Sequence, residues 1–262
     1  MSTGALFLAG IIPGVLMGFS LMILVYFIAK KRHYYMESRA NFNEIWIAFK
    51  EGFLPLLTPI FIVGGIISGI FTPTEAAVVA SAYALILGTL VYRTLSWYKI
   101  KKVILNTIIT SSTIVLIIAF ASPFSWLLAS SGIAKRMIEL ISSISINPNI
   151  ILLILNVFFL IIGMFMEAIS VMVIIVPILL PLITTLGIDP VHFGLIIVLN
   201  LMIGLVTPPF GLSLFTVAKL EKIEPNKIYK QCFLFSLPLI ITLFLLTYFP
   251  ELVLWLPRLV LG

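Results

Sequence analysis

Long stretches with at most one charged residue recur along this chain, and they limit what it can fold into. A helix needs about 20 apolar residues to cross the hydrocarbon core of a bilayer. Glu75 and Glu167 are the only charged residues inside these stretches. The stretches cover residues 4–28, 52–92, 103–134, 140–186, 190–218 and 232–249. The sequence therefore predicts an all-α polytopic membrane protein with about seven to nine membrane segments, because only helices or closed barrels span lipid.

Composition supports a lipid environment over an aqueous one. Hydrophobic residues make up 61% of the 262 residues and charged residues only 10%, whereas a soluble domain carries about 25% charged residues. The net charge of +6 arises from short basic clusters at 30–32, 93–102 and 219–230. Such clusters are typical of cytoplasmic connectors, so the charge does not indicate nucleic-acid binding. The single cysteine, Cys232, excludes a disulfide framework and a CxxC metal motif.

Three of the long stretches are interrupted by helix-breaking residues. Irregular backbone at membrane depth is tolerated only where it is buried in protein or lines a wet cavity. At such places helix N-termini attract anions, and helix C-termini and free carbonyls coordinate Na⁺. The interruptions at 68–77, 163–170 and 200–213 are therefore candidate binding elements.

Other breaks are expected to shape the chain without binding. Residues 41–51, "NFNEIWIAFKE", suit an amphipathic helix at the membrane interface. Pro123 is expected to interrupt the run at 106–132, and "NPN" at 147–149 to interrupt the run at 140–186. The aromatic tail "FPELVLWLPRLVLG" is expected to end the chain at the interface.

The interruption at "TPTE" has two compatible interpretations. Thr72 is a good N-cap, Pro73 suits the first helical position, and Glu75 is placed to close a capping box. That local role alone would explain Glu75. In the second interpretation, Glu75 also organises an ion or substrate site.

Glu167, in "GMFMEAIS", has no Ser or Thr three residues before it, so a capping box does not explain it. A carboxylate within the membrane is a functional-site hypothesis by default. A position at a loop tip near the interface, or an ion pair with a distant basic side chain, stays open as the alternative.

The run "GLVTPPFG" interrupts a predicted membrane helix, and a simple proline kink is the alternative to a full break in that helix. The two prolines are flanked by Thr207, which adds a hydroxyl, and by Gly204 and Gly211, which allow close approach and unusual torsions. We predict a break that supplies ligands. His192 is expected at a loop or helix start, and neither it nor His33 belongs to an HExxH motif, so an intramembrane enzyme is not expected.

Four segments together resemble the large membrane subunit of the tripartite ATP-independent periplasmic (TRAP) transporters. They are "LFLAGIIPGVLMG", "GIFTPTEAAVVASAYALILG", "GMFMEAISVMVIIVPILLPL" and "LGIDPVHFGLIIVLNLMIGLVTPPFGLSLF". They occur in the order that the family places them, and the resemblance covers nearly the whole chain.

The resemblance implies an elevator-type carrier built from inverted repeats, each with a re-entrant hairpin and a broken helix. It implies a multi-pass protein of the bacterial inner membrane that imports a small carboxylate, such as a C4-dicarboxylate or a sialic acid. Na⁺ is then the coupling ion and no cofactor is expected. The implied partners are the lipid bilayer, a small four-helix membrane subunit and a periplasmic substrate-binding protein.

The resemblance also assigns residues. It implies that Glu167, Ala168 and Ser170 sit at the second hairpin tip. The second broken helix would contain Asn200, Gly204, Thr207, Pro208, Pro209 and Gly211. Backbone carbonyls such as that of Gly204, with the Thr207 hydroxyl, are then Na⁺ candidates. Thr72, Thr74 and Glu75 match the family's "TPTEA" motif and are possible site residues.

One departure from the family is large. A full subunit carries an earlier repeat with a hairpin tip of the "SGSS" kind and its own "PPS" broken helix, and neither motif is present. We expect residues 1–40 to hold the last helix of the first repeat and a connector, and residues 41–262 the second repeat, within one transmembrane domain over 1–262. The chain would be a fragment, a split gene product with the first repeat on a separate chain, or a degenerate reading frame. The alternative function is a non-transporting remnant or bracing partner that lacks the first-repeat half of the site.

Overall fold

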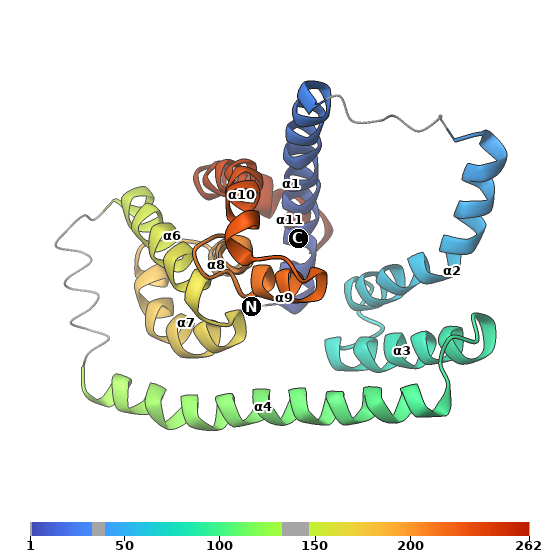
Figure 1. The fold of residues 1–262 in the computed structure, drawn as a ribbon. Helices are drawn as coiled ribbons and strands as arrows, with labels where there is room; N and C mark the ends of the chain where they lie inside the picture. The colour runs from blue at the N-terminus through green and yellow to red at the C-terminus, as the bar shows by residue number, and fades with distance from the viewer. Residues whose placement is uncertain (1, 33–39, 133–146, 262) are drawn as a thin grey trace. The chain divides into compact units, whose positions relative to one another are not determined.

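The computed structural model of the chain describes residues 2–32, 40–132 and 147–261, and every regular element within these ranges is a helix (Figure 1). Seven of the described helices are long and apolar enough to cross a membrane, and Pro190–Val206 is a shorter apolar helix. These findings confirm the prediction of an all-α polytopic membrane protein.

The chain divides into two compact units. The first contains Leu8–Arg32 and Ile114–Gly262, and the second contains Ser2–Phe7 and His33–Thr113. The single transmembrane domain over 1–262, with its boundary after residue 40, stays a prediction.

The second unit is built on a hairpin of two packed helices. Its elements are α2 (Phe42–Ile67), α3 (Pro73–Ile86), a π-helical turn η1 (Leu87–Val91) and the beginning of α4 (Trp97–Ser130). The Tyr83 hydroxyl donates to the Leu54 carbonyl at 2.9 Å, and the Tyr92 hydroxyl donates to the Glu51 carbonyl at 2.7 Å. Pro55 has no N–H to bond the Glu51 carbonyl, so Tyr92 satisfies an acceptor that this proline leaves free.

Two local predictions differ from the structure here. Residues 41–51 do not form a separate helix but begin α2, which a capping box between Asn41 and Glu44 starts and which is bent along its length (Figure 1). Pro55 and Pro59 inside α2 account for the bend. The predicted interruption at Pro123 is wrong, because α4 continues through it to Ser130. One proline removes one hydrogen bond of a long helix, and the remaining bonds keep the helix continuous.

The first unit packs around α8 (Pro190–Val206). Its other elements are most of α1 (Thr3–Arg32), the later part of α4, α6 (Pro148–Phe165), α7 (Ala168–Thr185), α9 (Leu212–Glu221), α10 (Pro225–Tyr248) and α11 (Glu251–Leu261). Helix α8 contacts α6, α7, α9, α10 and α11. The core between α6, α7 and α8 contains the fully buried side chains of Ile151, Phe159, Leu182, Phe193 and Leu201.

Local sequence explains how α6 and α8 begin. Asn147 caps α6, which confirms the predicted break at 147–149. Asp189 caps α8, with Pro190 at the first helical position. His192 lies in the first turn of α8 as predicted; it is buried, and its Nε2 lies 2.9 Å from the Leu246 carbonyl. The other histidine, His33, lies outside the described residues.

Candidate functional site

The turn between α6 and α7 contains Glu167. This residue is the N-cap of α7, and its Oε2 accepts from the Ser170 amide at 3.1 Å and lies 3.5 Å from the Ser170 hydroxyl oxygen. The sequence argument that capping could not explain Glu167 is therefore wrong, because the partner lies three residues after it rather than before. Ala168 is buried next to it, whereas Glu167 is exposed.

The break predicted in the "VTPPFG" run is present between α8 and α9. Helix α8 ends at Val206, Thr207 is its extended C-cap, and the Pro208–Pro209 bond is cis. Gly211 has a positive φ of 36° and is the N-cap of α9. The left-handed conformation favours glycine at that position. The predicted broken helix is thus confirmed as a local structure.

The backbones of helices α6 and α8 come into contact at Gly163 and Gly204. A Cβ added to Gly204 would lie 2.6 Å from the Gly163 carbonyl carbon and 2.7 Å from its Cα. Glycine at such positions lets the backbones of membrane helices meet. The rings of Phe165 and Phe210 lie 4.9 Å apart, so the hairpin turn and the break in α8–α9 are neighbours.

This neighbourhood brings together helix ends of both polarities. Gly163 and Gly204 each lie within three residues of the C-terminus of their helix, where unpaired carbonyls and the negative end of the dipole favour a cation. Helix α7 begins at Ala168 and helix α9 at Leu212, each a few residues after one of these ends, and their first amides favour an anion. Only α7 has a side-chain cap; the N-cap of α9, Gly211, supplies none.

Thr207 lies inside the protein with its hydroxyl at the break. Its side chain is 2% exposed, and its Oγ1 donates to the Ile203 carbonyl at 2.6 Å. The Ser236 hydroxyl oxygen of α10 lies 3.3 Å away. Since a hydroxyl carries one hydrogen and two lone pairs, Thr207 retains the capacity to accept or to coordinate. Ser236 was not identified from the sequence.

Asn200 joins a buried chain of polar side chains one turn before Gly204. Its Nδ2 donates to Asn156 Oδ1 at 2.6 Å and to the Ile196 carbonyl at 2.8 Å. Asn156 in turn donates to the Thr247 hydroxyl oxygen at 2.9 Å, and all three side chains are at most 1% exposed. Among the described residues, Asn200 Oδ1 is the buried side-chain polar atom without a hydrogen-bond partner.

Asn156 and Thr247 were also missed by sequence reasoning, and Gly163 lies in the predicted interruption at 163–170 but was not singled out. The signal for Asn156 was available, because it stands alone as an amide within the apolar run "IILLILNVFFLII". Gly163 and Thr247 gave no such signal, since their importance comes from a partner on another helix.

Thr72, Thr74 and Glu75 lie at the start of α3, in the second unit. Glu75 Oε2 accepts from the Thr72 amide and from its hydroxyl, both at 2.8 Å, and the Glu75 amide donates to Thr72 Oγ1 at 3.3 Å. The capping interpretation is confirmed. A role for these exposed residues in binding stays a prediction.

Comparison with known proteins identifies the family. The model of the "Tripartite ATP-independent periplasmic transporter, DctM component" family matches residues 1–252. The sialic acid TRAP transporter large permease protein SiaM of Vibrio cholerae is 42% identical over 100% of this chain. The C4-dicarboxylate TRAP transporter large permease protein DctM of Pseudomonas aeruginosa is 35% identical over 98% of it. The 2,3-diketo-L-gulonate TRAP transporter large permease protein YiaN of Escherichia coli is 32% identical over 97% of it.

The chain covers 61%, 60% and 60% of the lengths of these three relatives, or about three-fifths. The relatives are transport proteins of the inner membrane and not enzymes, which confirms the predicted location and the prediction that no enzyme is present. The chain belongs to the DctM family of TRAP transporter large permease proteins.

Proposed function

We propose that this chain forms part of the large permease of a TRAP transporter that imports a small carboxylate together with Na⁺. Relatives named for sialic acid and for C4-dicarboxylates support this substrate class. Sialic acid is the first substrate to test, since the relative named for it is 42% identical and the one named for C4-dicarboxylates is 35% identical.

The observation that carries the proposal is the contact of two helix C-termini at Gly163 and Gly204. Carbonyl oxygens and hydroxyls at broken helices are the ligands that Na⁺ uses in such carriers. The Gly204 carbonyl accepts the Thr207 amide at 3.0 Å and keeps a second lone pair. We assign Na⁺ to this carbonyl and the Thr207 hydroxyl, with Asn200 Oδ1 as a further acceptor along the same interface.

The two helix N-termini are not equivalent for the substrate anion. Glu167 already places a carboxylate at the N-terminus of α7, where it bonds the Ser170 amide and repels a second anion. The N-terminus of α9 carries no side-chain cap, because Gly211 occupies that position. We therefore propose that the substrate carboxylate binds the first amides of α9. The negative charge of Glu167 then favours Na⁺ in its neighbourhood.

Coupling then follows from charge. Na⁺ at the joined C-termini offsets their negative potential, and the adjacent N-termini hold the anion more strongly in its presence. In this proposal a periplasmic binding protein delivers the substrate, a small four-helix membrane subunit braces the permease, and a chain carrying the first repeat completes an elevator-type site.

The test is Na⁺-driven uptake in proteoliposomes that contain the chain with these three partners. Thr207→Ala is expected to raise the Na⁺ concentration needed for half-maximal uptake. Thr242→Ala is the matched control, because Thr242 is also a buried threonine that bonds the carbonyl four residues before it, at 2.9 Å, in α10. An unchanged Na⁺ dependence in Thr207→Ala would remove that residue from the site.

A non-transporting role, as a remnant or a bracing partner, is the alternative to this proposal. It predicts no uptake in any combination of partners and no effect of Na⁺ on the melting temperature of the chain. If uptake is equally fast without a Na⁺ gradient, the chain takes part in transport but Na⁺ is not its coupling ion.

A further inference from the structure

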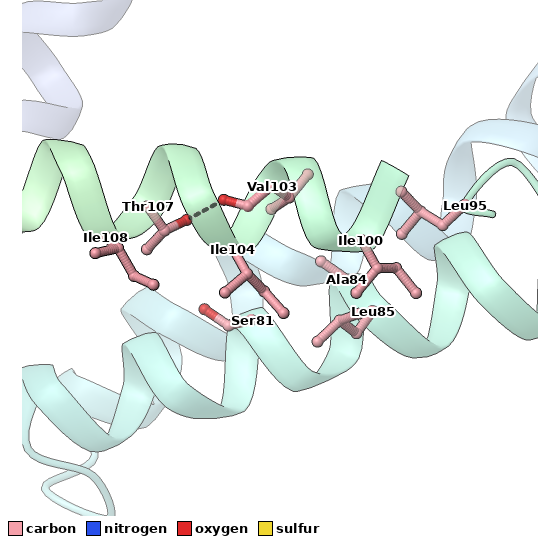
Figure 2. A pocket seen from close by; sticks show the side chains of 9 residues that line it. All are labelled: Ser81, Ala84, Leu85, Leu95, Ile100, Val103, Ile104, Thr107 and Ile108. Carbon is pink, nitrogen blue, oxygen red and sulfur yellow. Dashed lines mark hydrogen bonds between the residues drawn. The ribbon is translucent and has the colours of Figure 1, made fainter. Parts of the chain in front are cut away.

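A groove runs between α3 and the first turns of α4 in the second unit. Figure 2 shows its lining, with α4 on one side and α3 on the other. Its volume is about 500 Å³. The lining residues are Ser81, Ala84, Leu85, Leu95, Ile100, Val103, Ile104, Thr107 and Ile108. None of them belongs to the site proposed for Na⁺ or the substrate.

The groove presents mostly hydrocarbon and no free hydrogen-bond donor. The two hydroxyls in its wall bond their own helices: Ser81 Oγ donates to the Ala77 carbonyl and Thr107 Oγ1 to the Val103 carbonyl, both at 2.8 Å. A polar ligand would require convergent hydrogen-bonding groups, which small-molecule sites provide. This lining suits an alkyl chain instead.

One end of the groove is bordered by positive charge and aromatic rings. With about 100° of rotation per residue, Lys99 and Lys101 fall on either side of Ile100, which faces the groove. The Lys99 ammonium donates to the Thr94 carbonyl at 2.9 Å, and the Lys101 ammonium lies 5.9 Å from the centre of the Trp97 ring. Trp97 is 71% exposed.

These features mark the end of the groove as a membrane interface. Tryptophan and tyrosine are enriched at the level of the lipid headgroups, and basic residues follow on the cytoplasmic side. The side chain of Tyr98 is 77% exposed beside Trp97. From Ile100 to Ile108 the groove then extends about 12 Å along α4 into the apolar part of a predicted span.

We propose that this groove binds one anionic membrane phospholipid. An acyl chain lies between α3 and α4, and the phosphate lies at the mouth, where the flexible side chains of Lys99 and Lys101 can reach it. The anionic headgroup complements the lysines, and basic pockets between membrane helices on the cytoplasmic side bind such headgroups. A helix of a partner protein would fill the hydrocarbon lining but would leave Lys99 and Lys101 without a counter-charge.

Native mass spectrometry of the full chain in detergent tests the proposal with phosphatidylglycerol and with phosphatidylcholine of identical acyl chains. The wild-type chain is expected to retain phosphatidylglycerol more strongly. Lys99→Gln with Lys101→Gln should lower that retention about 25-fold, since each lysine near an anionic surface contributes about fivefold. Lys30→Gln with Lys31→Gln, at the C-terminal end of α1, is the control and should change nothing.

Filling the groove tests the acyl chain separately. Ala84→Phe, or Ser81→Leu where the first variant does not fold, should lower the retention of both lipids while the lysines remain. A photo-crosslinking residue at Ile104 should yield a lipid adduct in membranes. Equal retention of the two lipids by the wild-type chain, unchanged retention in the lysine variant, or a protein adduct at Ile104 would overturn the proposal.

Discussion

The contact between Gly163 and Gly204 gives a prediction with a definite sign. In Gly204→Ala the new methyl group would lie 2.6, 2.7 and 3.0 Å from the carbonyl carbon, Cα and carbonyl oxygen of Gly163. These are backbone atoms, which cannot turn aside as a flexible side chain can. Forcing an extra carbon into a packed interior costs about 1–3 kcal/mol. Alanine returns up to about 1 kcal/mol through its higher helix propensity, so the net destabilisation is about 0–2 kcal/mol.

Two further variants turn this estimate into a ranking. Gly163→Ala places its methyl group 3.1 Å from the Leu201 Cα, which is a milder contact. Gly18→Ala, in α1, meets nothing within 4 Å and should gain the helix-propensity term alone. The melting temperature of the full chain in detergent should therefore be highest for Gly18→Ala, intermediate for Gly163→Ala and lowest for Gly204→Ala. About 1 kcal/mol corresponds to roughly 2–4 °C for a chain of this size.

One outcome would contradict this ranking of melting temperatures. If Gly204→Ala melts at or above the temperature of Gly18→Ala, the backbones of α6 and α8 do not meet at this pair. In that case the adjacent C-termini, on which the Na⁺ assignment depends, would also be lost.

Three other predictions concern polar groups. Asn156→Leu should destabilise the chain by about 1–3 kcal/mol, because it removes one of the two acceptors of the buried Asn200 amide. The double variant with Asn200→Leu should cost less than the sum of the single variants in a thermal-melting cycle. Thr72→Ala should cost about 0.5–2 kcal/mol through loss of the α3 cap, whereas Thr74→Ala, which removes a hydroxyl outside the capping box, should leave the melting temperature unchanged. Glu167→Gln keeps an oxygen for the Ser170 amide but removes a negative charge from the N-terminus of α7, so it should cost no more than about 1 kcal/mol of stability. It should also raise the Na⁺ concentration required for half-maximal uptake, and an unchanged Na⁺ requirement would contradict the charge assigned to Glu167.

The breaks between helices could be predicted because their causes are local. The residues that start α3, α6 and α8 are N-caps followed by proline, and the pattern is visible within four residues. Pro123 was misjudged because a proline alone does not decide whether a long helix ends. Glu167 was misjudged because the sequence was searched for a cap before the residue and not after it.

The pairings that assemble the candidate site could not be predicted in the same way. Gly163 and Gly204 lie in separate helices, and so do Asn156, Asn200 and Thr247. Their proximity depends on how α6, α8 and α10 cross, which no local pattern specifies. The sequence identified Asn200, Gly204 and Thr207 on one helix but none of the residues that face them.

The glycine contact also has a mechanical consequence. No side chain separates the backbones of α6 and α8 at this point, so there is no rotamer whose change could let one helix slip past the other. Helix α6 with its turn into α7, and helix α8 with the break that follows it, are therefore expected to move as one rigid body. Any movement of the Thr207 break should be accompanied by the same movement of the α6–α7 turn.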